Sequence, residues 1–145
     1  QIFQSVHKLE MATNPRLPSL HLTLGTYEGS IIGYEGAIDD LENVYAYTPA
    51  ASSIKAISVN TKGVLAAGCS DDLLRLFDVR SRTEMGLVND YSGTPTVLKF
   101  YQNSHLFCGN QNGTITVWRC RDWEVLHQLK VGEAVRAFDI HPSGK

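Results

Sequence analysis

The strongest constraint on this chain is an internal repeat with a period of about 41 residues. The run from Leu74 to Asp78 stands 41 residues before the run from Ile115 to Arg119, and both runs are largely apolar. A third run, Ile31 to Glu35, has a similar pattern and begins 43 residues before Leu74. Self-similarity at one spacing indicates a repeated structural unit that buries its apolar surface against its neighbours.

The pattern within each repeat predicts four short β-strands. In residues 52–89, runs rich in Val, Ile, Leu and Phe alternate with turns rich in Asn, Asp, Gly and Ser. The run from Leu73 to Phe77 is almost continuously apolar, which favours a small sheet buried on both faces. The spacing of Gly25, Gly29 and Gly33 also fits a helix-packing motif, but the β-branched and aromatic residues between them favour strands.

Four strands in about 41 residues is the size of a β-propeller blade. The predicted fold class is therefore all-β, a β-propeller with about three blades in this chain. The expected segments are an N-terminal extension at 1–19, blade 1 at 20–50, blade 2 at 52–89, blade 3 at 93–130 and the first strand of blade 4 at 134–140. Met11 offers a start, so residues 1–10 are left out of the predicted fold.

A complete ring needs more residues than the sequence contains. Seven blades of this size require on the order of 300 residues, and ring closure is what removes sheet faces and edges from water. We expect the 145 residues to be a piece of a longer propeller. The alternative is one subunit of a ring assembled from several chains.

The end of the third strand in each repeat carries a recognisable dipeptide. Tyr34-Glu35, Phe77-Asp78 and Trp118-Arg119 occupy equivalent positions, and Phe77-Asp78 is similar to the Trp-Asp pair that names the WD40-repeat family. The resemblance covers residues 20–145 and implies a β-propeller, most often with seven blades. It also implies a buried tetrad of His, Ser or Thr, Asp and Trp in well-formed blades.

That tetrad is incomplete in this sequence. The tetrad positions with a matching or substituted residue are Asp71 and Phe77 in the second blade, and Asn112 and Trp118 in the third. Ala67 and Cys108 replace the hydroxyl residue, and Tyr91 stands where the family has His. We therefore expect apolar packing, rather than a polar network, to hold these blades together.

A narrower resemblance extends over several segments. Ser92 to Thr94, Leu98 to Tyr101, Trp123-Glu124 and Ile140 to Lys145 resemble the p21-activated-kinase-interacting (maintenance-of-killer) WD-repeat proteins. That family acts in the nucleolus in assembly of the large (60S) ribosomal subunit, and its members are also described as negative regulators of the kinase. The resemblance implies a non-catalytic scaffold in the nucleus and nucleolus, with pre-ribosomal factors or ribosomal proteins as partners.

Three other functions are weighed against the nucleolar scaffold. The first is a negative regulator that binds the regulatory region of a p21-activated kinase, and it rests on the same resemblance. The second is a generic WD40 adaptor in another complex. The third is a propeller enzyme with its site in the central channel, although the sequence has neither a G-x-S-x-G elbow nor a phosphate-binding G-x-x-x-x-G-K-[ST] loop.

The remaining chemistry predicts no catalytic residue, cofactor or metal. Asp71-Asp72 fits a tight turn, and the histidines and cysteines lack zinc-site spacing. Three widely spaced cysteines indicate a reducing compartment, with Cys69 and Cys108 as small buried residues. A formal net charge of −2 argues against nucleic-acid binding by bulk charge, and no apolar run is long enough to span a bilayer.

One set of turn residues is a candidate partner surface. Arg80 and Arg121 are 41 residues apart, and the surrounding turns add three more residues to the set: Arg82, Arg119 and Trp123. Turns between third and fourth strands emerge on one face of a propeller, so these residues could form a basic strip that touches RNA phosphates and stacks a base. The alternative is that they are ordinary solvated turns, with Trp123 covering its own blade.

Overall fold

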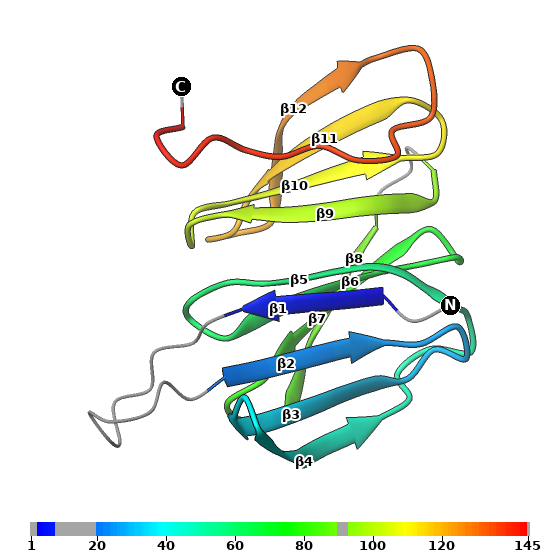
Figure 1. The fold of residues 1–145 in the computed structure, drawn as a ribbon. Coiled ribbons are helices and arrows are strands. Elements are labelled where there is room, and N and C mark those ends of the chain that lie inside the picture. The colour runs from blue at the N-terminus through cyan, green and yellow to red at the C-terminus, as the bar shows by residue number, and fades with distance from the viewer. Residues whose placement is uncertain (1–2, 8–19, 90–92, 145) are drawn as a thin grey trace.

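The structure is a computed structural model that describes residues 3–7, 20–89 and 93–144. Within these ranges it contains twelve β-strands in three antiparallel sheets of four, which lie side by side (Figure 1). The all-β class predicted from the repeat is confirmed. The same ranges hold no helix that could cross a membrane.

Each sheet is a simple meander in which the strands pair in chain order. The first sheet contains β1 (Phe3–His7), β2 (Leu20–Gly25), β3 (Ile31–Ala37) and β4 (Asp40–Tyr47). The second contains β5 (Ile54–Val59), β6 (Val64–Cys69), β7 (Leu73–Asp78) and β8 (Thr83–Asn89). The third contains β9 (Pro95–Tyr101), β10 (His105–Asn110), β11 (Thr114–Arg119) and β12 (Glu124–Lys130). The first strands β1, β5 and β9 follow one another along the same side of the stack.

The expected N-terminal extension at 1–19 needs correction. Its residues Phe3–His7 form β1, which pairs antiparallel with β2 from Phe3 opposite Gly25 to His7 opposite His21. A sheet made only of β2, β3 and β4 would leave the inner edge of β2 without hydrogen-bond partners, and β1 satisfies that edge. Met11, the start considered from the sequence, lies outside the described residues.

The expected first strand of a fourth blade, at 134–140, is not a strand in the structure. A strand is defined by ladder hydrogen bonds to a neighbour, and no described residue follows on its far side to supply them. The segment still lies along the third sheet. The Val135 amide donates to the Asn110 carbonyl at 3.1 Å, and the ring of Phe138 packs on Phe107.

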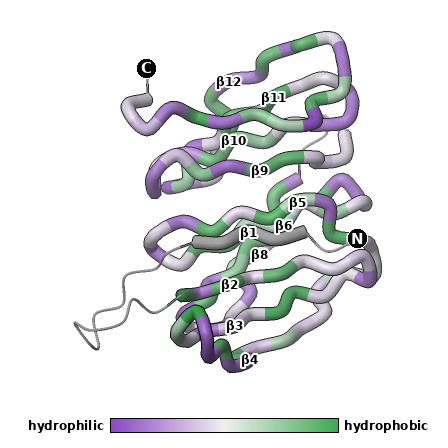
Figure 2. Tube along the Cα trace, in the orientation of Figure 1, coloured by the Kyte–Doolittle hydropathy of each residue, from purple (hydrophilic) through white to green (hydrophobic). Residues whose placement is uncertain are grey.

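Two apolar layers hold the three sheets together. The layer between the first and second sheets includes Ile31, Ile57 and Phe77, and the layer between the second and third includes Leu74 and Trp118. The middle sheet is therefore buried on both faces, as its almost continuous apolar run predicts. Figure 2 shows hydrophobic residues along the strands and hydrophilic residues at the turns. Burial of each large side chain contributes about 1.5–3 kcal/mol.

An equivalent glycine in each sheet permits this close stacking. Gly25, Gly68 and Gly109 end or nearly end the second strands. A Cβ built on them would lie 2.6 Å from the side chains of Ile54, Pro95 and Val135, respectively. Each glycine thus leaves room for the incoming segment of the next repeat. Val135 lies against Gly109 in the same way that Ile54 lies against Gly25 and Pro95 against Gly68. The segment around Val135 therefore occupies the position that the first strand of a following sheet would take.

Candidate partner-binding face

The turns that carry the predicted basic strip lie at one end of the second and third sheets. Arg80 and Arg82 belong to the turn between β7 and β8, and Arg119, Arg121 and Trp123 lie at the turn between β11 and β12. Arg82 and Trp123 are 41 residues apart and share a left-handed backbone, with φ of 58° and 57°. The two turns therefore share a left-handed residue at the equivalent position of the repeat.

The structure divides the strip between two hollows. Arg119, Arg121 and Trp123 line a cleft of about 410 Å³ between the second and third sheets. Arg82 instead lines a smaller hollow of about 240 Å³, together with Tyr47 and Phe77. Three of the five members of the strip thus share the larger cleft, and Arg82 lines the smaller hollow.

Arg80 has a contact of its own away from the cleft lining. Its guanidinium donates to the Thr61 carbonyl at 3.1 Å, which joins the last turn of the second sheet to the first turn of the same sheet. The aliphatic part of Arg80 also packs closely over Gly63. Gly63 has a φ of +89°, a backbone conformation that favours glycine. In this position the charge of Arg80 is exposed while its stem has a structural role.

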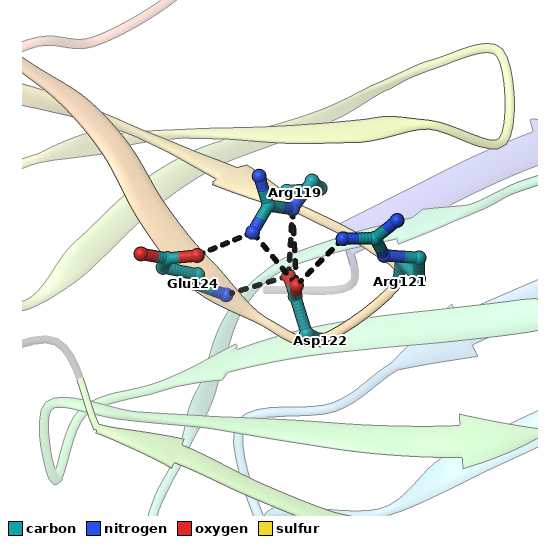
Figure 3. Close-up of polar contacts among 4 residues, drawn as sticks. All are labelled: Arg119, Arg121, Asp122 and Glu124. Atoms are coloured by element: carbon teal, nitrogen blue, oxygen red, sulfur yellow. Dashed lines mark hydrogen bonds and ion pairs between the residues drawn. The ribbon is translucent and has the colours of Figure 1, made fainter.

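The charges of the third-sheet turn are largely compensated (Figure 3). The Arg119 guanidinium donates to both carboxylate oxygens of Asp122, at 2.9 Å from Nε to Oδ1 and 2.7 Å from Nη2 to Oδ2, and it also pairs with Glu124. Arg121 reaches Asp122 only at 3.5 Å. Hydrogen bonding from Arg119 holds the pKa of the Asp122 carboxyl at about 2. Two cations and two carboxylates meet here, so the uncompensated charge is small.

The cleft has an apolar interior with a basic rim. Its apolar members are Val64, Met85, Cys120 and Trp123, and its basic members are Lys62, His105, Arg119 and Arg121. The polar remainder is Asn60, Asn103 and Ser104. Trp123 is half-buried because its ring packs against the apolar layer between the second and third sheets.

The tetrad positions lie in separate local environments. Asp71 accepts from the Leu73 amide at 3.3 Å and pairs with Arg75 at 2.7 Å, and Asn112 accepts from the Thr114 amide at 3.2 Å. Phe77 and Trp118 are almost fully buried in the two apolar layers. In these two sheets, the described residues therefore place Phe77 and Trp118 in the apolar layers and Asp71 and Asn112 at exposed turns. Tyr91 lies outside them.

The first sheet contains a buried polar network that the sequence analysis missed. His21 Nε2 lies 2.9 Å from the Tyr45 hydroxyl, Thr23 Oγ1 lies 3.0 Å from the same hydroxyl, and His21 Nδ1 lies 2.8 Å from Glu35. His21 and Thr23 alternate on one face of β2, which is a signal the sequence offers. Its partner Tyr45 comes from β4, and its ring lies where a side chain on Gly33 would stand. The pKa of Tyr45 is raised by burial.

Potential metal ligands do not cluster in the part of the chain that the structure describes. Within the described ranges, no three His, Cys, Asp or Glu side chains are close enough to hold a metal ion. Cys69 and Cys108 are buried, as predicted, and burial raises the pKa of the Cys69 thiol. Burial also raises the pKa of Cys120 in the cleft to about 11, so this thiol is protonated at neutral pH.

No protein-family model matches the chain. Comparison with curated proteins nevertheless identifies several relatives with related names. A p21-activated protein kinase-interacting protein 1-like protein from Danio rerio is 32% identical over 131 residues, covering 87% of this chain and 35% of the relative. Its counterpart from Xenopus laevis is 33% identical over 132 residues, covering 88% and 36%. Protein MAK11 from Saccharomyces cerevisiae is 29% identical over 152 residues, covering 86% and 36%. The chain spans about a third of the length of these relatives.

Comparison with solved structures identifies the fold. The structure of U3-55K and the RRP9 WD40 repeats each match with a TM-score of 0.67 at 14% identity, covering 75% of this chain and 35% and 34% of those chains. A chain of the mitotic checkpoint complex matches with a TM-score of 0.68 at 16% identity, covering 79% and 36%. The stacked four-stranded sheets therefore have the fold of consecutive WD40 β-propeller blades, and the sequence is similar along most of its length to the p21-activated protein kinase-interacting protein 1-like proteins and MAK11.

Proposed function

We propose that this chain belongs to a non-catalytic WD40 scaffold that acts in the nucleolus during assembly of the large ribosomal subunit. The observation that carries the proposal is homology along 86–88% of the chain to p21-activated protein kinase-interacting protein 1-like proteins and MAK11. The fold supports it physically. Apolar layers on both faces of the middle sheet hold the stack together, and turns at the two ends of that stack can contact different partners.

Co-sedimentation tests this role. The full-length protein, carrying an epitope tag, is followed through a sucrose gradient of nuclear extract. We expect it to migrate with precursors of the large subunit and to localise to the nucleolus, and its depletion is expected to reduce mature large subunits relative to small ones. A protein that stays at the top of the gradient, with unchanged subunit ratios after depletion, contradicts the proposal.

A second candidate is a negative regulator that binds a p21-activated kinase. The names of the relatives favour it, because the Danio rerio relative is called kinase-interacting and a Schizosaccharomyces pombe relative is called Shk1 kinase-binding protein 15. The test is a pull-down of the full-length protein with the purified regulatory region of such a kinase. Direct binding and reduced kinase activity support this candidate, and recovery only with pre-ribosomal particles argues against it.

The non-catalytic part of the proposal has its own test. Arg119 and Arg121 are close to carboxylates, and the pKa of Cys120 lies far above neutrality, so the candidate face offers no activated nucleophile within the described residues. A screen of the full-length protein against generic ester and phosphate substrates is expected to give only background turnover. Saturable turnover that survives repurification would overturn this part.

A further inference from the structure

We propose that the cleft between the second and third sheets binds a short acidic peptide segment of a partner protein, with an apolar side chain seated between its carboxylates. The inference deepens the scaffold role proposed above and rests on it, because it assigns a partner chemistry to one surface of the scaffold. It is carried by the shape of the cleft, the charge of its rim and the rigidity of its walls.

The interior of the cleft suits an apolar anchor. At about 410 Å³ it is large enough for a bulky side chain and part of the adjoining backbone. Met85 lines it from β8 and is 50% exposed, while Trp123 lines it from the opposite sheet. A flexible thioether and an indole ring in one cleft lining make a surface that adapts to aliphatic or aromatic side chains.

The rim attracts carboxylates. Lys62, His105, Arg119 and Arg121 line the cleft, and no carboxylate among the described residues does so. Lys62 makes no ion pair with any described residue, and Arg121 is 80% exposed with a single long contact to Asp122. These two cations stand on different sheets, so carboxylates on either side of one anchor residue can meet one cation each. Such complementarity steers association and fixes the register of a peptide.

The walls are held in place before any partner arrives. Asn60 Oδ1 accepts from the amides of Lys62 and Val64, at 3.0 and 2.9 Å, which fixes the first turn of the second sheet. The Asn103 oxygen ties the same turn to the third sheet. A cleft with fixed walls loses little conformational entropy on binding, which favours a short segment.

The same observations favour a peptide over RNA. Trp123 is half-buried against the apolar layer, and Arg119 is engaged by Asp122 and Glu124. Besides His105, only Lys62 and Arg121 of the basic residues in the cleft are then available for phosphates, whereas RNA binding without base-specific contacts depends on several such neutralised phosphates. An apolar interior also offers nothing to a phosphate backbone. RNA is therefore the competing outcome of the test.

The experiment measures binding of a defined probe to the full-length protein. The probe is a fluorescein-labelled octapeptide, Glu-Asp-Glu-Leu-Phe-Glu-Asp-Glu, followed by fluorescence anisotropy. A control peptide carries Ser-Ser in place of Leu-Phe, and labelled oligouridine serves as the nucleic-acid probe. We expect saturable binding of the first peptide that weakens as salt rises, with at least about tenfold weaker binding of the Ser-Ser peptide.

Matched variants locate the site. Lys62→Glu and Arg121→Glu are each expected to weaken binding about tenfold, whereas Lys130→Glu makes the same charge change on β12 away from the cleft and leaves it unchanged. Met85→Ser is expected to weaken binding, whereas Leu87→Ser changes an equally exposed residue of the same strand outside the cleft lining and does not.

Three results would overturn the inference. The first is that the peptide does not bind. The second is that the cleft variants and their controls lose peptide affinity equally. The third is that oligouridine binding depends on Lys62 and Arg121 while peptide binding does not. Circular dichroism of each variant establishes that it is folded. The gradient experiment separates this inference from the scaffold role. If the protein co-sediments with precursors but does not bind the peptide, the inference is wrong and the scaffold role still stands.

Discussion

The side-chain oxygen of Asn103 accepts a hydrogen bond from the Thr61 hydroxyl at 3.0 Å, across the boundary between the second and third sheets. The same oxygen accepts a second bond from the Lys62 amide at 3.2 Å. One side chain in the first turn of a sheet thereby fixes the equivalent turn of the preceding sheet. Both turns border the cleft, so this contact links the stacking of the blades to the geometry of the candidate site.

The first prediction concerns that contact. Asn103→Ala removes the acceptor of two hydrogen bonds, and we expect it to lower the free energy of unfolding by about 1 kcal/mol. The measurement is a urea titration of the full-length protein. Gln128→Ala, at an exposed position of β12, is the control and is expected to change stability little. Equal stability of the two variants would show that Asn103 does not hold the sheets together.

The second prediction concerns the glycine at the sheet boundary. Gly68→Ala places a Cβ 2.6 Å from the Cβ of Pro95, and we expect it to destabilise the protein by about 1–3 kcal/mol. The double variant with Pro95→Gly removes the clash, so the two changes together should cost less than the sum of each alone. Unfolding free energies that simply add would argue against close approach at this boundary.

The architecture could be predicted from the sequence because a repeated pattern indicates how the units pack more reliably than one apolar run of residues does. Leu74 and Phe77 are both apolar because the middle sheet has a neighbour on each face, and both are buried. The strand Phe3–His7 was missed because Met11 offers a start and residues 1–10 were therefore left out of the predicted fold, although Phe3–His7 pairs with β2. The segment 134–140 was wrongly predicted to be a strand because its apolar pattern matches the repeat, whereas a strand also needs a neighbouring strand with which to pair.

The candidate site was less predictable than the fold. The repeat placed Arg80, Arg121 and Trp123 at one end of the stack, but only side-chain geometry separates the cleft residues from Arg80, which reaches the Thr61 carbonyl instead. Met85 was not singled out, because an apolar residue on an outer strand has no distinctive spacing. The assignment of these residues to a partner stays a prediction for the binding experiments above.

The third prediction concerns the polar network of the first sheet. Tyr45→Phe removes the hydroxyl that lies 2.9 Å from His21 and 3.0 Å from Thr23, leaving two buried polar groups short of a partner. We expect a loss of about 1–3 kcal/mol in unfolding free energy. Tyr27→Phe, at a residue that is 67% exposed, removes the same atom and serves as the matched control. A Tyr45→Phe variant as stable as this control would contradict a structural role for the network.

The fourth prediction concerns the pH dependence of the turn in Figure 3. Hydrogen bonding from Arg119 lowers the pKa of Asp122 from 3.8 to about 2, so its stabilising contribution is complete above pH 3.8 and is lost as the pH falls through about 2. Carbon-13 NMR of the Asp122 carboxyl should therefore show a midpoint near 2 in the native protein. Arg119→Gln should move that midpoint toward the ordinary value, because the charged donor is gone. The chemical shift of Asp139, whose carboxyl pairs with Lys99 at 3.0 Å, provides an internal control that Arg119→Gln leaves unchanged. Identical Asp122 midpoints in the two proteins would exclude Arg119 as the cause of the low pKa.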